Sequence, residues 1–285
     1  MALIFALIVG GFYAFYVYNH YQQGISAMDS YNFIAAQRHF DKLPFKDDFL
    51  SDEYAYIQAG VLMDQGQYLD ALEAFDNLDS FPISVSILEK LGDRIVAEED
   101  PYDALSTVEN LKRISLPASS VGSLKARLYK AGQDAYQNDK FFVARNYFSK
   151  LGDYSRAEDY VFLIEHRLDP FCTEESHYQK LLTLIGFEDA NVLLIKSENF
   201  TKQFLCGRWE EKGTYKYFEI DKDYRCTHNL PYTYTGGYYY LDYGEYSTGK
   251  TKSESIAQFK FTIIDSNAIS VYCYKDGSTH KMYRK

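Results

Sequence analysis

The sequence predicts a multidomain protein in which helices precede strands. A transmembrane helix leads into an α-solenoid of helix pairs, and a small antiparallel β-barrel of about eight strands ends the chain. Three observations predict this order: an uncharged apolar run at the start, a helical pattern that recurs in the middle, and a period-two pattern after Phe204. We expect the anchor at 1–23, the helix pairs at 24–170, a helical connector at 171–200 and the β domain at 201–285.

The composition limits the classes of protein to which the chain can belong. Its 285 residues are 46% hydrophobic and 17% aromatic, which excludes a disordered chain. The formal charge of −10 argues against nucleic-acid binding, because that binding depends on basic residues that neutralise phosphates. We therefore expect one large or two ordinary folded domains and no nucleic-acid partner.

The first segment, Ala2–Tyr18, is apolar and carries no charge. Its 17 residues extend about 25 Å as a helix, slightly less than the ~30 Å hydrocarbon core of a bilayer. Tyr13, Tyr16, Tyr18 and Tyr21 are typical of a membrane interface. No basic residue precedes the run and no small-residue cleavage site follows it, which favours an uncleaved single-pass anchor over a signal peptide. A buried first helix of the helical array is the alternative.

The orientation of this anchor follows only from a default. No Lys or Arg stands before the run, so the positive-inside rule has almost nothing to count. We expect the N-terminus inside and the bulk of the chain outside the cytoplasm. The missing basic flank also leads us to expect further residues upstream of Met1.

The middle of the chain contains a repeated pattern. Four segments share an Ala, an apolar residue four positions later and a Leu three positions after that, and the Ala positions are 35, 33 and 40 residues apart. A small residue stands twelve positions before each Ala. The positions expected to pack the helices of each pair are Gly24, Ala36, Phe40, Ala59, Ala71, Phe75, Gly92, Ala104, Gly132, Ala144 and Phe148. This spacing predicts two amphipathic helices per unit, whose small residues allow close approach.

This pattern resembles the tetratricopeptide repeat over about residues 21–151. In the best copy, small and aromatic residues stand where that family has them: Ala59, Gly66, Tyr68, Ala71 and Phe75. The family's Trp is absent, Leu replaces its third small residue, and the last interval is too long. The resemblance implies a scaffold that receives a peptide or partner protein on its concave face. A non-repeating helical bundle has the same period and is the alternative.

Charge is unevenly distributed along this region. Asp29–Asn110 holds 18 acidic and 5 basic residues, a balance of −13, whereas Leu111–Pro170 holds 7 acidic and 10 basic residues, a balance of +3. One interpretation is a surface that steers a basic partner. The other is ordinary solvated helix faces that serve solubility.

The last part of the chain has the pattern of a sheet. Ala257–Ile263 and Ile269–Tyr274 alternate apolar and polar residues, and about eight such short segments are joined by turns. Closure into a small barrel would remove the unpaired edges. Gly207 and Trp209 on the first strand and Arg284 on the last resemble a lipocalin-like arrangement, in which a basic residue covers the Trp. A barrel this small either holds a ligand or is filled by its own side chains.

A dense group of tyrosines lies within this region. Tyr234, Tyr238 and Tyr240 are the candidate binding surface, because exposed Tyr offers contact area with a polar tip. Ordinary strand propensity explains the same residues equally simply.

No motif for catalysis, a cofactor or a metal is found in the sequence. The four cysteines are either free or paired, for example Cys206 with Cys273; they stand at Cys172, Cys206, Cys226 and Cys273. We expect a membrane-anchored, non-enzymatic protein-interaction scaffold of a bacterial cell envelope, with a protein or peptide partner and no cofactor. The alternative is a module that binds a lipid or glycan through the β domain.

Overall fold

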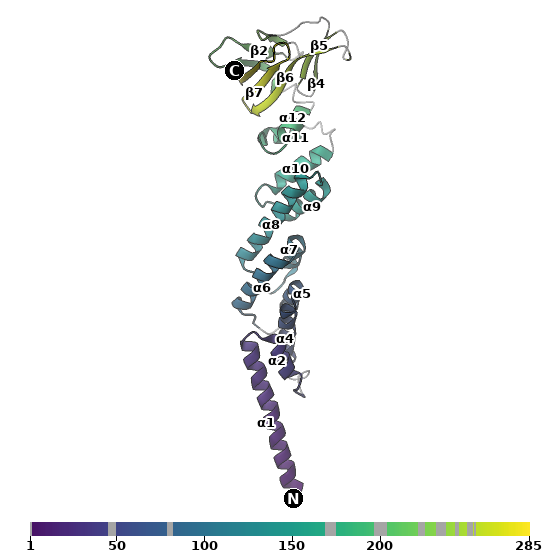
Figure 1. Ribbon diagram of the computed structural model, residues 1–285, viewed down its shortest axis with the longest axis vertical. Coiled ribbons are helices and arrows are strands. Elements are labelled where there is room, and N and C mark those ends of the chain that lie inside the picture. Colours follow the sequence, from purple (N-terminus) through teal and green to yellow (C-terminus); the bar gives the residue numbers. More distant parts are fainter. Residues whose placement is uncertain are drawn as a thin grey trace. The chain divides into compact units, whose positions relative to one another are not determined.

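The computed structural model describes most of the chain as helices followed by strands (Figure 1). The described residues are 2–44, 50–78, 82–168, 175–196, 204–221, 226–231, 238–242, 245–249, 253 and 255–285. They form two compact units, Met1–Ser155 and Arg156–Lys285. This division falls inside the region expected to hold helix pairs, and the boundaries expected at 23, 170 and 200 stay predictions.

The first unit consists of helices only. Eight are described in it: α1 (Ala2–Asp29), α2 (Phe33–Phe40), α4 (Ser51–Asp64), α5 (Tyr68–Asp76), α6 (Val85–Glu98), α7 (Pro101–Asn110), α8 (Ala118–Gln137) and α9 (Phe141–Leu151). Local sequence explains several starts. The Asp100 carboxylate accepts the N–H of Tyr102, and Pro101 occupies the first turn of α7. The side chains of Asn32 and Ser84 cap α2 and α6 in the same way.

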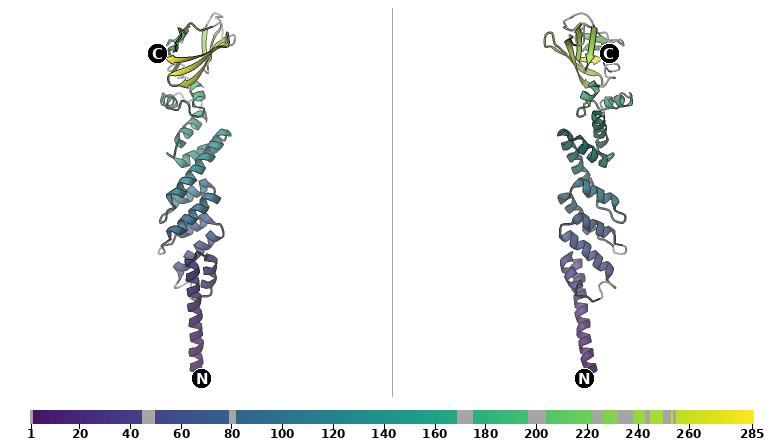
Figure 2. Two further views of the ribbon diagram at one scale, coloured as in Figure 1. Left: turned by 60° about the vertical axis from the view of Figure 1, so that its left-hand side comes forward. Right: turned by 90° about the vertical axis from the view of Figure 1, so that its right-hand side faces the viewer.

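Helices that are neighbours in sequence mostly pack against each other in this unit (Figure 2). α1 packs on α2, α4 on α5, and α8 on α9, while α2 also contacts α4. These contacts bury the apolar stripe of each amphipathic helix. The predicted region of paired helices is therefore confirmed.

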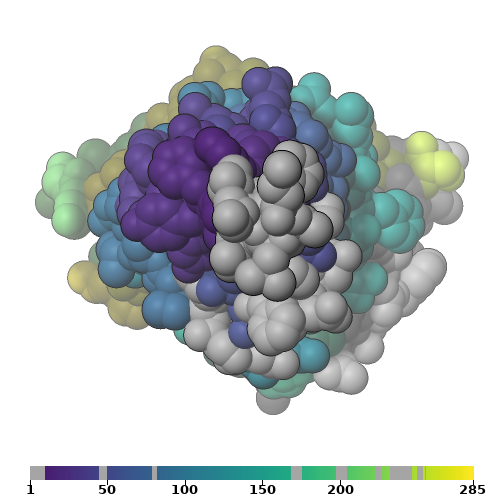
Figure 3. Space-filling model, turned by 90° about the horizontal axis from the view of Figure 1, so that it is seen from below, coloured from purple at the N-terminus to yellow at the C-terminus, as the bar shows by residue number. Residues whose placement is uncertain are grey.

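The longest helix of the chain is α1, with 28 residues. Its C-terminal half packs on α2, and Figure 3 looks onto its N-terminal end, drawn in purple where the side chains are described. Phe12, Phe15 and Tyr18 are 72%, 68% and 61% exposed. In the part of the chain that the structure describes, no helix combines the length and the hydropathy that a membrane crossing requires.

The second unit joins three short helices to an antiparallel sheet. Its helices are α10 (Ala157–Leu168), α11 (Glu175–Thr183) and α12 (Ala190–Lys196). The described strands are β1 (Gly207–Glu211), β2 (Tyr217–Ile220), β3 (Cys226–His228), β4 (Tyr238–Asp242), β5 (Glu245–Gly249), β6 (Ile256–Asp265), β7 (Ala268–Cys273) and β8 (Thr279–Arg284). β6 and β7 coincide with the two alternating segments predicted at 257–263 and 269–274, and the described strands agree with the predicted number of about eight.

The sheet is a curled antiparallel meander with the order β3-β2-β1-β8-β7-β6-β5-β4. The first and last strands pair, with Trp209 opposite Arg284. Among the described residues, β3 and β4 form the two ends of the sheet and no pairing joins them. The inner face is aromatic, and Trp209, Phe218, Phe259 and Phe261 are at most 2% exposed.

Candidate functional site

The residues expected to pack the helix pairs are buried in the first unit. Ala36, Ala59, Ala71, Ala104 and Ala144 are fully buried, and so are the aromatic positions Phe40, Phe75 and Phe148. This burial agrees with helix faces that pack on one another.

Two of the helix pairs share the same contact. In the first, the ring of Phe40 lies where a side chain at Gly24 would stand, and in the last, a Cβ at Gly132 would come within 2.9 Å of the Phe148 ring. Each Gly precedes its Phe by 16 residues. The repeated spacing therefore produces a repeated close approach of two helices.

The third helix pair departs from this pattern. Val108 stands where the other copies have Phe, and Gly92 meets Ser120 and Pro117 of the following segment instead of its own pair. α6 accordingly packs against α8. The sequence period alone carries no sign of this change of partner.

An acidic residue five positions after the repeat Ala links one helix pair to the next in three copies. Asp41 accepts the Tyr54 hydroxyl at 2.7 Å, and the Glu109 carboxylate lies 2.6 Å from the Lys150 ammonium. Asp76 bonds to the backbone that follows α7. Part of the acidic charge of this region therefore has a structural role that was not predicted from the sequence, although the regular position of these acidic residues was a usable signal.

Of these three acidic residues, Asp76 accepts the most hydrogen bonds among those described. Its carboxylate accepts backbone N–H groups from Lys112, Arg113 and Ile114 at 2.7–3.1 Å, and the residue is only 7% exposed. Burial by itself raises the pKa of Asp76, but these hydrogen bonds and the Lys112 charge outweigh burial and hold the pKa below its usual value. The carboxylate therefore stays ionised inside the unit.

A pocket of about 190 Å³ opens beside this carboxylate, between the ends of α5 and α7. Glu73 and Asn77 line it from one helix, and Thr107, Asn110 and Lys112 from the other side. The ends of two helices meet there, and their C-termini carry partial negative charge. Glu73 adds a negative charge and Lys112 a positive charge to the wall.

In the second unit, the structure brings Gly207, Trp209 and Arg284 together through the pairing of β1 with β8. The Arg284 guanidinium lies 4.8 Å from the Trp209 ring centroid and also donates to the Phe204 carbonyl. The Trp209 indole N–H donates to the Leu205 carbonyl at 3.1 Å. The only Trp of the chain is thus covered by a cation and has its polar atom satisfied.

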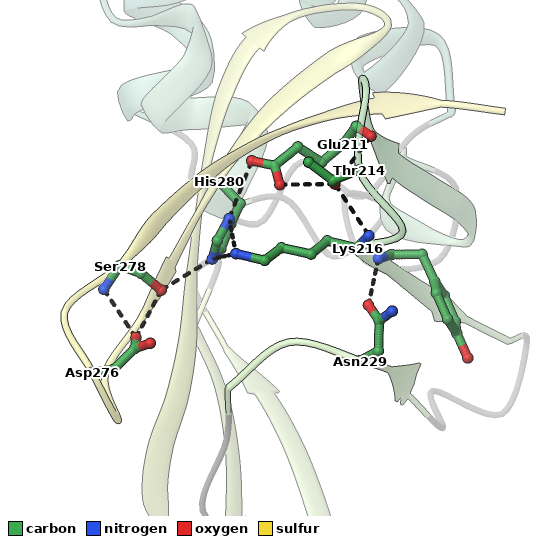
Figure 4. A network of polar contacts seen from close by, with 8 residues as sticks. Glu211, Thr214, Lys216, Asn229, Asp276, Ser278 and His280 are labelled. Atoms are coloured by element: carbon green, nitrogen blue, oxygen red, sulfur yellow. Dashed lines mark hydrogen bonds and ion pairs between the residues drawn. The ribbon is translucent and has the colours of Figure 1, made fainter.

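A polar cluster lies where β1, β2 and β8 begin or end (Figure 4). His280 is 4% exposed; its Nδ1 lies 3.2 Å from Glu211 Oε1 and its Nε2 lies 3.0 Å from Ser278 Oγ. The Lys216 ammonium lies 3.4 Å from both ring nitrogens. Burial raises the pKa of Glu211, but hydrogen bonds to His280 and Thr214 lower it by more, so that its pKa is below its usual value.

Ser278, His280 and Glu211 have the spacing of a nucleophile, a base and an orienting carboxylate. The Ser278 hydroxyl, however, donates to Asp276 Oδ1 at 2.7 Å, and the Ser278 N–H bonds to the same oxygen. The N–H of Gly277 bonds to the Cys273 carbonyl. These neighbouring amides are thus unavailable to a developing oxyanion, and the cluster is better explained as a satisfied turn and strand end.

The structure describes only some of the candidate tyrosines and cysteines. Tyr234 and Cys172 lie outside the described residues, and Tyr238 and Tyr240 lie on β4 with side chains that are not described. Cys206, Cys226 and Cys273 are free thiols, so the Cys206–Cys273 bridge is not formed. Burial raises the pKa of Cys226 to about 12, which makes this thiol unreactive. In the described parts of the chain, no three His, Cys, Asp or Glu side chains gather as metal ligands.

No family model, no curated protein and no solved structure matches this chain. The fold therefore defines the protein only as a region of paired helices followed by a curled antiparallel sheet.

Proposed function

We propose that the protein is a non-enzymatic interaction scaffold, whose tetratricopeptide-like helix pairs bind a basic segment of a partner protein. The observation that carries this proposal is the repeated seam of Gly24 with Phe40 and Gly132 with Phe148. A rigid stack of helix pairs presents extended surfaces without needing a catalytic site.

The acidic charge of this region supports a basic partner. Three of the acidic side chains already bond to a neighbouring helix pair, so they are less available to a partner than the exposed acids: Asp41, Asp76 and Glu109. Asp70, Glu73, Glu89, Asp93 and Asp103 remain exposed. An acidic surface of this kind raises the association rate of a basic partner and loses that effect at high salt.

We further propose that the N-terminal part of α1 attaches the scaffold to a membrane, with the bulk of the chain outside the cytoplasm of a bacterial cell. The 17 uncharged residues of Ala2–Tyr18 and the exposed Phe12 and Phe15 support attachment. The proposed orientation rests on the default for an anchor that has no flanking basic residues.

The second candidate function is a lipid or glycan site in a lipocalin-like barrel. The cover of Trp209 by Arg284 favours it. The inner face, however, is filled by side chains that pack on one another and thereby occupy the space that a ligand would take: Trp209, Phe218, Phe259 and Phe261. The scaffold is therefore the better supported proposal.

Titration of the full chain with a basic and an acidic peptide tests the scaffold. The basic peptide should bind in a salt-dependent way, and neutralisation of the exposed acids of the helix pairs should weaken it. Equal binding of both peptides would overturn the proposal.

A further inference from the structure

Two histidines face each other across the seam between α1 and α2. Nδ1 of His20 lies 3.1 Å from Nδ1 of His39. The ring centroids are 5.4 Å apart, only 2.3 Å more than the two nitrogens, so the nitrogens lie close to the line between the rings. The rings therefore meet head to head, as an N–H donor and a lone-pair acceptor do.

This geometry fixes how many protons the pair can hold. A neutral pair has one Nδ1–H donor and one bare Nδ1 acceptor, and a pair with one additional proton keeps the same hydrogen bond with a charged donor. A pair with two additional protons has N–H groups on both facing nitrogens. The hydrogen bond is then lost and two positive charges face each other at 3.1 Å.

The positive charge of Lys42 opposes the second proton. Lys42, in the turn after α2, adds a positive charge that acts on His20. From α1, the Tyr16 ring packs on His20 at a centroid distance of 4.4 Å. The nearby Asp41 carboxylate accepts the hydroxyl of Tyr54 from α4.

The position of the pair gives its protonation a structural consequence. His20 precedes Gly24 by one helical turn, and His39 directly precedes Phe40, so the pair adjoins the Gly24–Phe40 seam. On the other side of His20, α1 continues into the exposed residues Phe12, Phe15 and Tyr18. The His20–His39 contact therefore determines whether the packing of α1 on α2 extends one turn beyond Gly24 toward the N-terminus.

We propose that His20 and His39 form a proton-controlled clasp, which closes α1 onto α2 near neutral pH and opens when both imidazoles are charged. The clasp does not depend on the proposed scaffold function. Opening falls below the ordinary histidine pKa of about 6.5, because desolvation, the Lys42 charge and the charge on His39 all lower the pKa of His20.

Hydrogen exchange of the full-length protein tests the clasp. Amide protection of residues 13–27, corrected for intrinsic rates, is compared at about pH 7.5 and about pH 5.0 in one detergent buffer. We expect the wild type to lose about tenfold in protection at the lower pH. His39→Asn keeps an uncharged hydrogen-bonding atom near the Nδ1 position and should show equal protection at both pH values. His177→Asn, in the second unit, is the matched control and should behave as the wild type.

Two results would overturn the proposal. One is unchanged protection of the wild type at the lower pH, and the other is a pH response in His39→Asn as large as that of the wild type. If His39→Asn does not fold, nitrogen NMR of the wild type decides instead. At about pH 7.5 one of the two Nδ1 atoms must be protonated and the other bare, and two bare Nδ1 atoms would contradict the clasp.

Discussion

Asp76 accepts the backbone N–H of Arg113 at 2.7 Å, which ties the end of α5 to the segment that follows α7. The same carboxylate also binds the N–H groups of Lys112 and Ile114. A buried carboxylate that gathers several amides fixes the spacing of two successive helix pairs, because moving either pair would leave charge or amides unpaired. The positions of the exposed side chains on the helix pairs depend on this spacing.

Replacing Asp76 should loosen this link. In Asp76→Asn, an NH2 group replaces one carboxylate oxygen. Because Oδ1 accepts from Arg113 and Ile114 and Oδ2 accepts from Lys112, at least one backbone N–H loses its shortest bond in either orientation of the amide. We expect the free energy of unfolding of the helical unit to fall by about 2–4 kcal/mol. Urea unfolding followed by circular dichroism at a helix wavelength measures this. Asp70→Asn on the exposed face of α5 is the control and should change stability by less than about 0.5 kcal/mol.

The lowered pKa of Asp76 also predicts that the free energy of unfolding falls as the pH drops into the acid range. The folded protein holds the carboxylate ionised more strongly than the unfolded chain does, so the unfolded chain takes up the proton first as pH falls. The contribution of Asp76 is fully present above the ordinary Asp pKa of about 3.9 and is lost as pH drops through the folded value. Stability of the wild type measured against pH should therefore fall more steeply in acid than that of Asp76→Asn. Parallel curves would contradict the role of this carboxylate.

The Gly24–Phe40 seam should tolerate no added methyl group. Gly24→Ala places a Cβ against the Phe40 ring, and we expect a loss of about 1–3 kcal/mol despite the better helix propensity of Ala. Gly122→Ala is the matched control, because this helical Gly of α8 has no atom within 4 Å of a new Cβ. It should be neutral or stabilise by up to about 1 kcal/mol. The same urea unfolding assay compares them, and equal effects would show that the seam is not close-packed.

The sequence predicted those parts of the fold that depend on periodicity. The eight described strands follow from the period-two pattern after Phe204, and the paired helices follow from the recurring Ala, apolar and Leu positions. The change at Gly92 was not predictable, because a Gly in a helix gives no sign of which helix approaches it. His280, Glu211 and Lys216 were missed because they are distant in sequence and meet only once β1 pairs with β8.

Arg284 should stabilise the sheet through Trp209. Arg284→Ala removes both the cation over the indole ring and the donor to the Phe204 carbonyl, and we expect a loss of about 1–3 kcal/mol. Trp209 is the only Trp, so its fluorescence reports on this unit alone. The unfolding midpoint by fluorescence should fall and the native emission should shift to longer wavelength. Lys285→Ala, at an exposed neighbouring position, should leave both unchanged.

Membrane attachment should depend on the exposed aromatics of α1. Flotation with vesicles of phosphatidylethanolamine and phosphatidylglycerol measures the bound fraction of the full chain. We expect Phe12→Ser with Phe15→Ser to lower vesicle affinity at least about tenfold, because two large apolar side chains are lost from the bilayer interface. Phe142→Ser removes an equally exposed aromatic of α9 and should have no effect. Equal losses in the two variants would argue against attachment through α1.

Binding of a lysine-rich peptide tests the scaffold most directly. A labelled peptide of about a dozen alternating Lys and Ser residues is titrated with the full chain at about 50 mM salt, beside a Glu and Ser peptide. The array variant carries Asp70→Asn, Glu73→Gln and Asp103→Asn, and the matched control carries Asp153→Asn, Glu158→Gln and Glu219→Gln outside the acidic region. We predict that only the Lys peptide binds, and that the array variant loses about tenfold in affinity while the control changes less than about twofold. Equal losses in both variants, or no binding of the Lys peptide, would contradict the proposal.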